Sequence, residues 1–209
     1  MKKNPKDVVR EGYDRIADQY DEYRAPFSDE AELDEFMSSV KPGGHVLDAG
    51  CGTGIVTRHL VDNGYQVTGI DISQKMLDLA KQRVPEATLK VGDMTALDFE
   101  DDSFDGLVST YAVFHVPRTK HSVLFRGFHR ILKKGGALLF SVGARPEPSD
   151  GVWEWDELQS VPMYWSSNGP EKTVELLKSA GFEIIFTRSV ETQTPTEIEK
   201  HYWILARAK

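Results

Sequence analysis

The chain has 209 residues, which fits one domain, because domains typically contain about 50 to 250 residues. Its 33 acidic residues outnumber its 25 basic residues, and the net charge of −8 argues against non-specific binding to nucleic acid or anionic membranes. Cys51 is the only cysteine, so no intrachain disulfide can form, which is typical of a reducing cytosol. No apolar run approaches the roughly 20 residues that span a bilayer, and the basic N-terminus lacks the apolar core of a secretory signal. These features predict a cytoplasmic protein without a membrane or nucleic-acid partner.

Short β-rich runs alternate with helical patterns, which predicts an α/β fold with a mostly parallel sheet covered by helices on both faces. The expected strands are residues 45–48, 66–71, 88–91, 105–110, 137–142, 183–189 and 203–208. The expected helices are residues 55–63, 73–83, 118–133 and 170–180. Only a linker over residues 190–200, which contains Pro195, separates the last two strands, so these strands are expected to form an antiparallel hairpin.

Two segments lie outside this alternation. Residues 5–40 are expected to be helical, and residues 143–169 are expected to be an ordered but irregular connection rich in Pro and Trp. A connection of that length is usually functional or disordered. Ligands of open α/β sheets bind at the carboxyl ends of the strands, where residues 143–169 begin. The aromatic residues of this segment are expected either to wall a ligand pocket or to pack as core under a long loop.

The segment VLDAGCGTG at residues 46–54 joins an apolar strand to three glycines at alternate positions. Gly50, Gly52 and Gly54 have no Cβ atom, so they tolerate positive φ and let a ligand lie against the backbone. The free N–H groups at the start of the following helix favour an anionic group. This turn therefore predicts a nucleotide-like ligand, whereas Cys51 within it is expected to be structural.

A dinucleotide-binding enzyme is the first alternative for this pattern. Such enzymes carry G-x-G-x-x-G, whereas the spacing here is G-x-G-x-G. Asp71 ends the second strand, where an acid accepts hydrogen bonds from ribose hydroxyls in either class of protein. Asp93 follows the third strand, where an acid can hold an adenine amino group. No Tyr is followed four residues later by Lys, the pair that a short-chain dehydrogenase needs, so an NAD-dependent oxidoreductase is disfavoured.

Five motifs in order carry a family resemblance. They are VLDAGCGTG at 46–54, GIDIS at 69–73, VGDMTALDF at 91–99, FDGLVSTYAVFHV at 104–116 and ILKKGGALLFSV at 131–142. With them the chain resembles the class I S-adenosylmethionine (SAM)-dependent methyltransferases, and within these the small-molecule methyltransferases. The resemblance implies a single Rossmann-like domain over residues 1–209, a three-layer sandwich. Its seven-stranded, mostly parallel sheet would have the order 3-2-1-4-5-7-6, with the last strand antiparallel.

The resemblance also implies that the cofactor is SAM and that the product is S-adenosylhomocysteine (SAH). In this family Asp71 would take the ribose hydroxyls, Asp93 would read the adenine edge, and Tyr20, within YDRIADQYD at 13–21, would close over the methionine carboxylate. Arg24 is a second candidate for that carboxylate. The implied cofactor contacts are Tyr20, Asp48, Gly50, Gly52, Gly54, Asp71, Ile72, Asp93, Met94 and Thr110.

Fewer residues of the sequence indicate how the acceptor would bind. His115 follows the fourth strand, on the loop that in this family faces the transferring methyl group. A neutral imidazole there would remove a proton from an acceptor, since its unperturbed pKa is about 6.5, or it would orient the substrate or cap the next helix. The expected substrate contacts are Tyr111, His115, Tyr164 and Trp165. Residues 5–40 would form a helical lid and residues 143–169 an insert near the acceptor, which together would enclose a small molecule.

The predicted activity is in-line methyl transfer from SAM to an O, N, S or C atom of a small-molecule acceptor. A SAM-binding protein without catalytic activity is the alternative from another class, and an oxidoreductase is less favoured. The six histidines lie apart and only one cysteine exists, so no metal site is predicted. A monomer or a homodimer is expected, and the sequence does not identify the acceptor.

Overall fold

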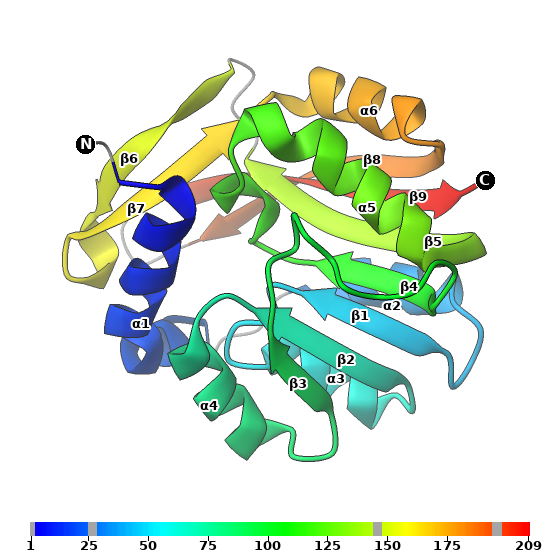
Figure 1. Cartoon of the computed structure of the whole chain (residues 1–209), viewed down its shortest axis with the longest axis horizontal. Coiled ribbons are helices and arrows are strands. Elements are labelled where there is room, and N and C mark those ends of the chain that lie inside the picture. The colour runs from blue at the N-terminus through cyan, green and yellow to red at the C-terminus, as the bar shows by residue number, and fades with distance from the viewer. Residues whose placement is uncertain (1–2, 25–28, 144–147, 194–197) are drawn as a thin grey trace.

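The computed structural model describes residues 3–24, 29–143, 148–193 and 198–209 (Figure 1). Within them, seven strands form one sheet in the order β3-β2-β1-β4-β5-β9-β8. β1 to β5 are parallel, and β9 is antiparallel to both β5 and β8. Numbered within this sheet alone, the order is the predicted 3-2-1-4-5-7-6, so the Rossmann-like α/β class is confirmed. The strands are β1 (His45–Ala49), β2 (Gln66–Asp71), β3 (Thr88–Val91), β4 (Phe104–Ser109), β5 (Leu132–Gly143), β8 (Phe182–Gln193) and β9 (Ile198–Ala208).

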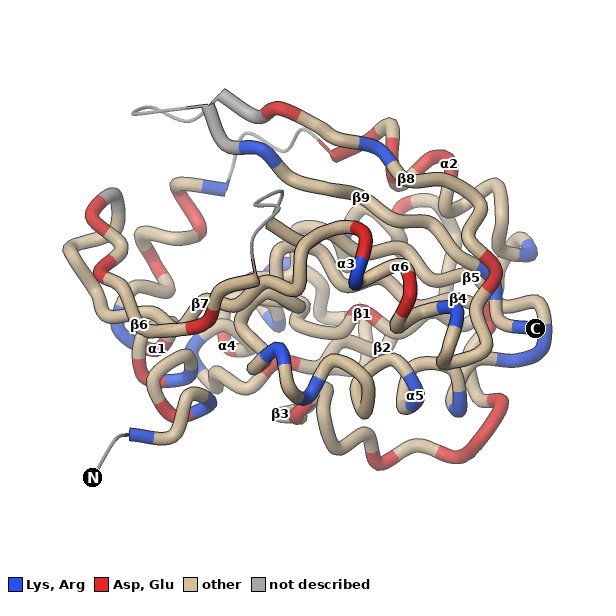
Figure 2. Tube along the Cα trace, turned by 90° about the horizontal axis from the view of Figure 1, so that it is seen from above, with Lys and Arg blue, Asp and Glu red and all other residues tan. Residues whose placement is uncertain are grey.

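Helices cover both faces of this sheet (Figure 1). The α-helices are α1 (Pro5–Arg24), α2 (Glu30–Ser38), α3 (Ile55–Asp62), α4 (Gln74–Arg83), α5 (His121–Ile131) and α6 (Pro170–Ser179). Short 3-10 helices are η1 (Val113–His115), η2 (Arg118–Lys120) and η3 (Asp156–Leu158). Within the described ranges, no helix is both long and apolar enough to cross a bilayer. Acidic and basic residues are interspersed over the described chain (Figure 2).

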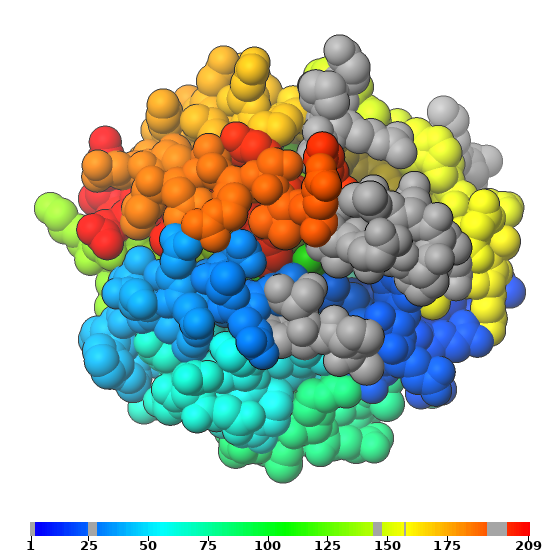
Figure 3. All heavy atoms as spheres, turned by 180° about the vertical axis from the view of Figure 1, so that it is seen from behind, coloured from blue at the N-terminus to red at the C-terminus, as the bar shows by residue number. Residues whose placement is uncertain are grey.

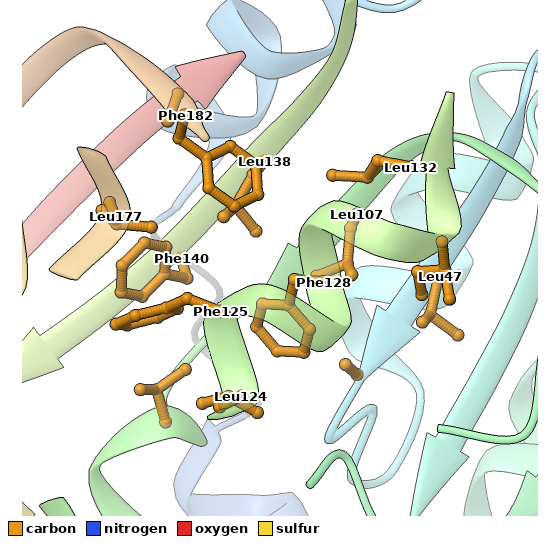
Figure 4. Close-up of a cluster of buried hydrophobic side chains, with 14 of the residues drawn as sticks. Leu47, Leu107, Leu124, Phe125, Phe128, Leu132, Leu138, Phe140, Leu177 and Phe182 are labelled. Atoms are coloured by element: carbon orange, nitrogen blue, oxygen red, sulfur yellow. The ribbon is translucent and has the colours of Figure 1, made fainter. Parts of the chain in front are cut away.

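The core on one face is an aromatic cluster under α5. Leu124, Phe125 and Phe128 recur at helical spacing, so they form one apolar face of α5, and all three are fully buried. Figure 4 shows Phe125 beside Phe140 of β5, and the centroids of the two rings are 5.4 Å apart. Phe182 belongs to the same cluster, at the start of β8. This packing fixes β4 and β5, and with them the loop that follows β4.

The other face is covered by α2 and α3. Phe36 of α2 and Leu60 of α3 are fully buried in a cluster that includes Trp203 of β9. α2 also contacts the sheet edge through Arg188 of β8, which pairs with Glu32 at 3.1 Å. Figure 3 shows β8 in orange lying against the blue segment that contains α2.

Residues 143–169 differ from the expected irregular connection. They form a two-stranded antiparallel sheet of β6 (Ser149–Trp155) and β7 (Val161–Ser167). Between these strands the chain turns through η3 and through Gln159 and Ser160, whose φ angles are 59° and 47°. Glycine and asparagine usually mark left-handed positions, so this turn carries no ordinary hairpin signal.

Some expected boundaries are also corrected. The helix expected from residue 118 begins at His121, after η2. The predicted antiparallel hairpin near the C-terminus is confirmed, but β8 runs to Gln193 and β9 starts at Ile198, so most of the expected linker is strand. Pro195 lies outside the described residues.

The packing of α2 on β4 generates a stability prediction. A Cβ atom at Gly106 would lie 2.7 Å from Cζ of Phe36 and 2.8 Å from Cγ2 of Val40. We expect Gly106→Ala to lower the free energy of unfolding by about 1–3 kcal/mol through overpacking. Thermal unfolding would show a fall in Tm of about 2–4 °C per kcal/mol. Gly143→Ala is the control, because no atom of the described residues lies within 4 Å of its Cβ position. An unchanged Tm for Gly106→Ala would contradict the packing of α2 described above.

Candidate active site

The carboxyl ends of the parallel strands converge on one cavity. β1, β2, β3 and β4 run in the same direction, so the loops that follow them lie at the same edge of the sheet. A cavity of about 280 Å³ lies at this edge, and α1 supplies part of its wall. The predicted site residues that line it are Tyr20, Gly50, Gly52, Asp71, Ile72, Asp93, Met94, Thr110, Tyr111 and His115.

The three glycines of the first turn have different positions. All have positive φ, and Gly50 and Gly52 line the cavity. A Cβ atom at Gly50 would lie 2.5 Å from Cβ of Ala112, so a side chain is excluded there. Gly54 does not line the cavity, and its Cβ position lies 3.1 Å from Cβ of Ala80 in α4. Its observed effect is therefore to let α3 and α4 approach.

Asp71 is held by the backbone at both oxygens. Oδ2 accepts the N–H of Gly52 at 2.9 Å, and Oδ1 accepts the N–H of Ser73 at 2.9 Å. Burial raises the pKa of Asp71 to about 6, although these backbone hydrogen bonds act in the opposite direction. Each carboxylate oxygen retains a lone pair, so Asp71 can still accept hydrogen bonds from a diol.

Asp48, by contrast, lies behind the cavity. It is fully buried, and its Oδ2 accepts the hydroxyl of Thr57 at 2.6 Å in the first turn of α3. Burial raises the pKa of Asp48 to about 7. The structure thus places the side chain of Asp48, a β1 residue, against the first turn of α3 and not on the cavity wall, so its predicted contact with the cofactor ammonium group remains a prediction.

The carboxylate of Asp93 already has hydrogen-bond and ion-pair partners within the protein. Its Oδ1 accepts the N–H and the hydroxyl of Thr95 at 2.8 and 2.7 Å, and its Oδ2 lies 2.8 Å from Nζ of Lys6. Burial acts to raise the pKa of Asp93, but the hydrogen bonds from Lys6 and Thr95 outweigh it and lower the pKa. Asp93 is therefore ionised at neutral pH. Lys6, Met76 and Lys120 are cavity residues that the sequence did not indicate.

His115 is bonded at both ring nitrogens. Its Nδ1 lies 2.7 Å from the carbonyl oxygen of Tyr164, and its Nε2 lies 2.8 Å from the hydroxyl of Tyr13. A carbonyl only accepts, so Nδ1 carries the proton and Nε2 accepts the hydrogen bond that Tyr13 donates. Burial lowers the pKa of His115 to about 4, against the effect of the Tyr164 carbonyl, so the imidazole is neutral at pH 7. Burial raises the pKa of Tyr13 well above its usual value.

Tyr13 is a cavity residue that the sequence analysis left without a role. It lies on α1 seven residues before Tyr20, a spacing that places both on one helix face. The two rings are 5.3 Å apart and nearly perpendicular. This spacing is the signal in the sequence from which a role for Tyr13 could have been inferred.

The aromatic residues of the hairpin lie behind this pair. Tyr164 contributes its backbone carbonyl to His115, and the ring of Trp165 lies 4.6 Å from the ring of His115. Neither residue lines the cavity. The hairpin thus supports the Tyr13–His115 pair, while direct acceptor contacts by Tyr164 and Trp165 remain predictions.

Tyr111, two residues after the end of β4, has a strained backbone conformation. Its φ is 54°, which is uncommon for a residue with a bulky side chain. Its hydroxyl donates to Asp29 at 2.8 Å, and Asp29 also pairs with Arg24 at 2.9 Å. Arg24 and Tyr111 line a smaller hollow of about 30 Å³ beside the glycine turn and the first turn of α3. Arg24 is therefore next to the helix N-terminus where an anionic group is favoured.

No group of three or more His, Cys, Asp or Glu residues that could hold a metal ion occurs in the part of the chain that the structure describes.

Comparisons with known proteins show the family of the chain. A model of the methyltransferase domain matches residues 47–140. A demethylmenaquinone methyltransferase from Symbiobacterium thermophilum is 33% identical over 156 residues, which are 66% of this chain and 60% of that protein. An uncharacterized methyltransferase from Bacillus thuringiensis is 30% identical over 172 residues, which are 80% of this chain and 71% of that protein. A crystal structure of a SAM-dependent methyltransferase from Methanosarcina mazei matches with a TM-score of 0.74 at 25% identity, covering 82% of this chain and 95% of that one.

The chain therefore belongs to the class I SAM-dependent methyltransferases. The resemblance carried by the five motifs is confirmed. The chain spans 60% of the Symbiobacterium protein, and 55% and 48% of two other bacterial methyltransferases that it matches.

The protonation of Asp71 generates a prediction for cofactor binding. The pKa of Asp71 in the free protein is about 6, so below that pH the carboxyl must lose its proton before both oxygens can accept ribose hydroxyls. We expect the affinity for SAH to fall as the pH drops below about 6, by up to about tenfold per pH unit. Asp93, whose pKa is lowered, stays ionised over this range. Calorimetric titrations between about pH 5 and about pH 8 would measure the slope.

The matched variant is Asp71→Asn, which keeps the shape but replaces one acceptor oxygen by a donor amide. We expect its affinity for SAH at neutral pH to be lower by about tenfold or more, because a hydrogen bond to a charged group contributes about 1.5–3 kcal/mol. In this variant, most of the dependence of SAH affinity on pH should disappear. A slope that persists in this variant would show that a group other than Asp71 titrates.

Proposed function

We propose that this chain is a methyltransferase that transfers the methyl group of SAM to a small-molecule acceptor. The observation that carries the proposal is the cavity at the sheet edge, which is lined by Asp71, Asp93 and the hydrogen-bonded Tyr13–His115 pair. α1 supplies part of the cavity wall, and a lid of this kind would favour a small acceptor over a polymer. The Symbiobacterium relative supports the same class, because its name gives demethylmenaquinone, a small molecule, as its substrate.

The residues present fit SAM. Asp71 would hold the ribose, and the backbone at Gly50 and Gly52, where no side chain obstructs, would receive the methionine part. Ile72 and Met94 offer apolar surface for the adenine ring beside Asp93. When bound, SAM supplies an electrophilic methyl group on a sulfonium sulfur. Burial and fixed hydrogen bonds already hold the carboxylates in place, so the site is ordered before a ligand enters.

The Tyr13–His115 pair would receive the proton of the acceptor. Tyr13 donates its own proton to Nε2 of His115, and a lone pair of its oxygen, which also lies beside Tyr20, would accept an N–H or O–H of the substrate. As the nucleophilic atom forms its new bond, its proton would pass to Tyr13 and the tyrosine proton to Nε2. His115, with a pKa of about 4, is a weak base, so this relay suits a nucleophile that becomes acidic during the transfer. Alignment and exclusion of water would supply most of the rate, about 7–11 kcal/mol in favourable cases.

Titration of the purified protein with SAM, SAH and NAD, each alone, tests the cofactor. We expect both adenosyl ligands to bind and NAD not to bind. The protein would then be incubated with SAM labelled in its methyl group and with either the small-molecule or the macromolecular fraction of a bacterial extract. Label should enter the small-molecule fraction. Binding of NAD alone, or label only in macromolecules, would contradict the proposal, and binding without any transfer would favour a non-catalytic SAM-binding protein.

Tyr13→Phe tests the relay. This substitution keeps the ring packing and removes the hydroxyl, so we expect kcat with the acceptor so found to fall by about 10²-fold, while SAH affinity changes little. Tyr65→Phe is the control, because it removes a tyrosine hydrogen bond, to the carbonyl of Met37, at the opposite end of β2. Full turnover by Tyr13→Phe would exclude the relay.

A further inference from the structure

The first turn of α1 places the ammonium group of Lys6 at the wall of the cavity. Asn4 fixes this turn, since its Oδ1 accepts the N–H of Lys6 at 3.1 Å and its carbonyl accepts the N–H groups of Asp7 and Val8. Nζ of Lys6 lies 2.8 Å from Oδ2 of Asp93. Asn4, Lys6 and Asp93 all line the cavity. This ion pair is therefore part of the site and not a remote surface contact.

The partners of Asp93 leave one oxygen for a ligand. Oδ1 is taken twice, by the N–H and the hydroxyl of Thr95, so a further donor must use Oδ2. An ionised carboxylate has about four lone-pair sites on its two oxygens, so Oδ2 can accept from Lys6 and from a ligand amino group at once. The cavity is open with Lys6 in this position, so the ion pair leaves space for a ligand.

We propose that Lys6 is a positioning residue for the cofactor, which fixes Asp93 for the adenine amino group and couples that contact to the docking of α1. The inference rests on the proposed function, in which Asp93 receives the adenine. In the free protein the pair is partly open to water, with the side chains of Lys6 and Asp93 49% and 22% exposed. An adenine placed beside Asp93 would displace water and strengthen the pair, because the attraction grows as the dielectric falls. By linkage, the pair then strengthens adenine binding by the same factor.

Lys6→Met tests this role, because it retains the apolar stem and removes the charge. We expect SAH to bind about five- to tenfold more weakly, the lower range of couplings between linked sites. Lys6→Arg should restore most of the affinity. Lys3→Met is the matched control and should not change it, because Lys3 pairs with Glu11 of α1 and does not line the cavity.

Two further measurements separate positioning from a general effect on folding. In an Asp93→Asn background, Lys6→Met should cost no further SAH affinity, since the ion pair is already absent. S-inosylhomocysteine carries an oxygen in place of the adenine amino group, so the preference of the protein for SAH over this ligand should shrink in Lys6→Met. A merely structural role would lower both affinities equally and would add to the effect of Asp93→Asn.

The direction of the change in SAH affinity in Lys6→Met also tests the role of Lys6. Tighter binding of SAH by Lys6→Met would overturn the inference, because Lys6 would then compete with the adenine for Asp93. Unchanged binding by Lys6→Met, with normal binding by the wild type, would overturn it while leaving the proposed function intact. Failure of the wild type to bind SAH would reject the proposed function, and this inference with it.

Discussion

The carboxylate of Asp71 is the contact on which the geometry of the site depends. It lies at the end of β2, and its two oxygens accept N–H groups from the glycine turn after β1 and from Ser73 at the start of α4. The parallel strands bring the loops after β1 and β2 near each other, and the side chain of Asp71 links these two loops through hydrogen bonds. Burial opposes its charge, as the raised pKa shows, and the backbone N–H groups offset part of that cost. The fold keeps an ionisable group at a buried position that destabilises its charged form, which is typical of a functional site.

The position of α1 depends on apolar packing more than on ion pairs. Its apolar face packs closely on the hairpin, to the point that a Cβ atom at Gly12 would lie 2.7 Å from Cε of Met163. Burying an apolar side chain contributes about 1.5–3 kcal/mol, whereas an exposed ion pair contributes about 0–1 kcal/mol. Packing therefore holds α1 in place, and polar contacts set its register against the loops of the site. These contacts are Lys6–Asp93, Tyr13–His115, Asp14–Ser73 and Asp21–Arg83.

The parts of this molecule that could be predicted from sequence are those governed by local patterns. Apolar runs that end in glycine or in an acid located β1 and β2 and the residues that follow them, because a buried parallel strand and a tight turn both need particular residue types. The β6–β7 hairpin escaped prediction, since Gln159 and Ser160 take left-handed conformations that their side chains do not signal. The Tyr13–His115 bond joins residues 102 positions apart and follows only from the docking of α1. The same holds for Lys6, because a charged residue in a first helical turn is ordinarily solvated.

The environment of His115 limits the chemistry that the site can perform. In a catalytic triad a carboxylate behind the imidazole stabilises the imidazolium, and the histidine becomes an effective base. Here the group behind Nδ1 is the neutral carbonyl of Tyr164, and burial lowers the pKa of the ring to about 4. A base of this strength cannot draw a proton from an unactivated alcohol before methyl transfer, because the difference between the two pKa values is too large. It can accept a proton from a nitrogen or oxygen that becomes strongly acidic as its new bond forms. In the proposed methyl transfer, the site would thus favour an acceptor that is already a competent nucleophile, and the protein would mainly align that acceptor and exclude water.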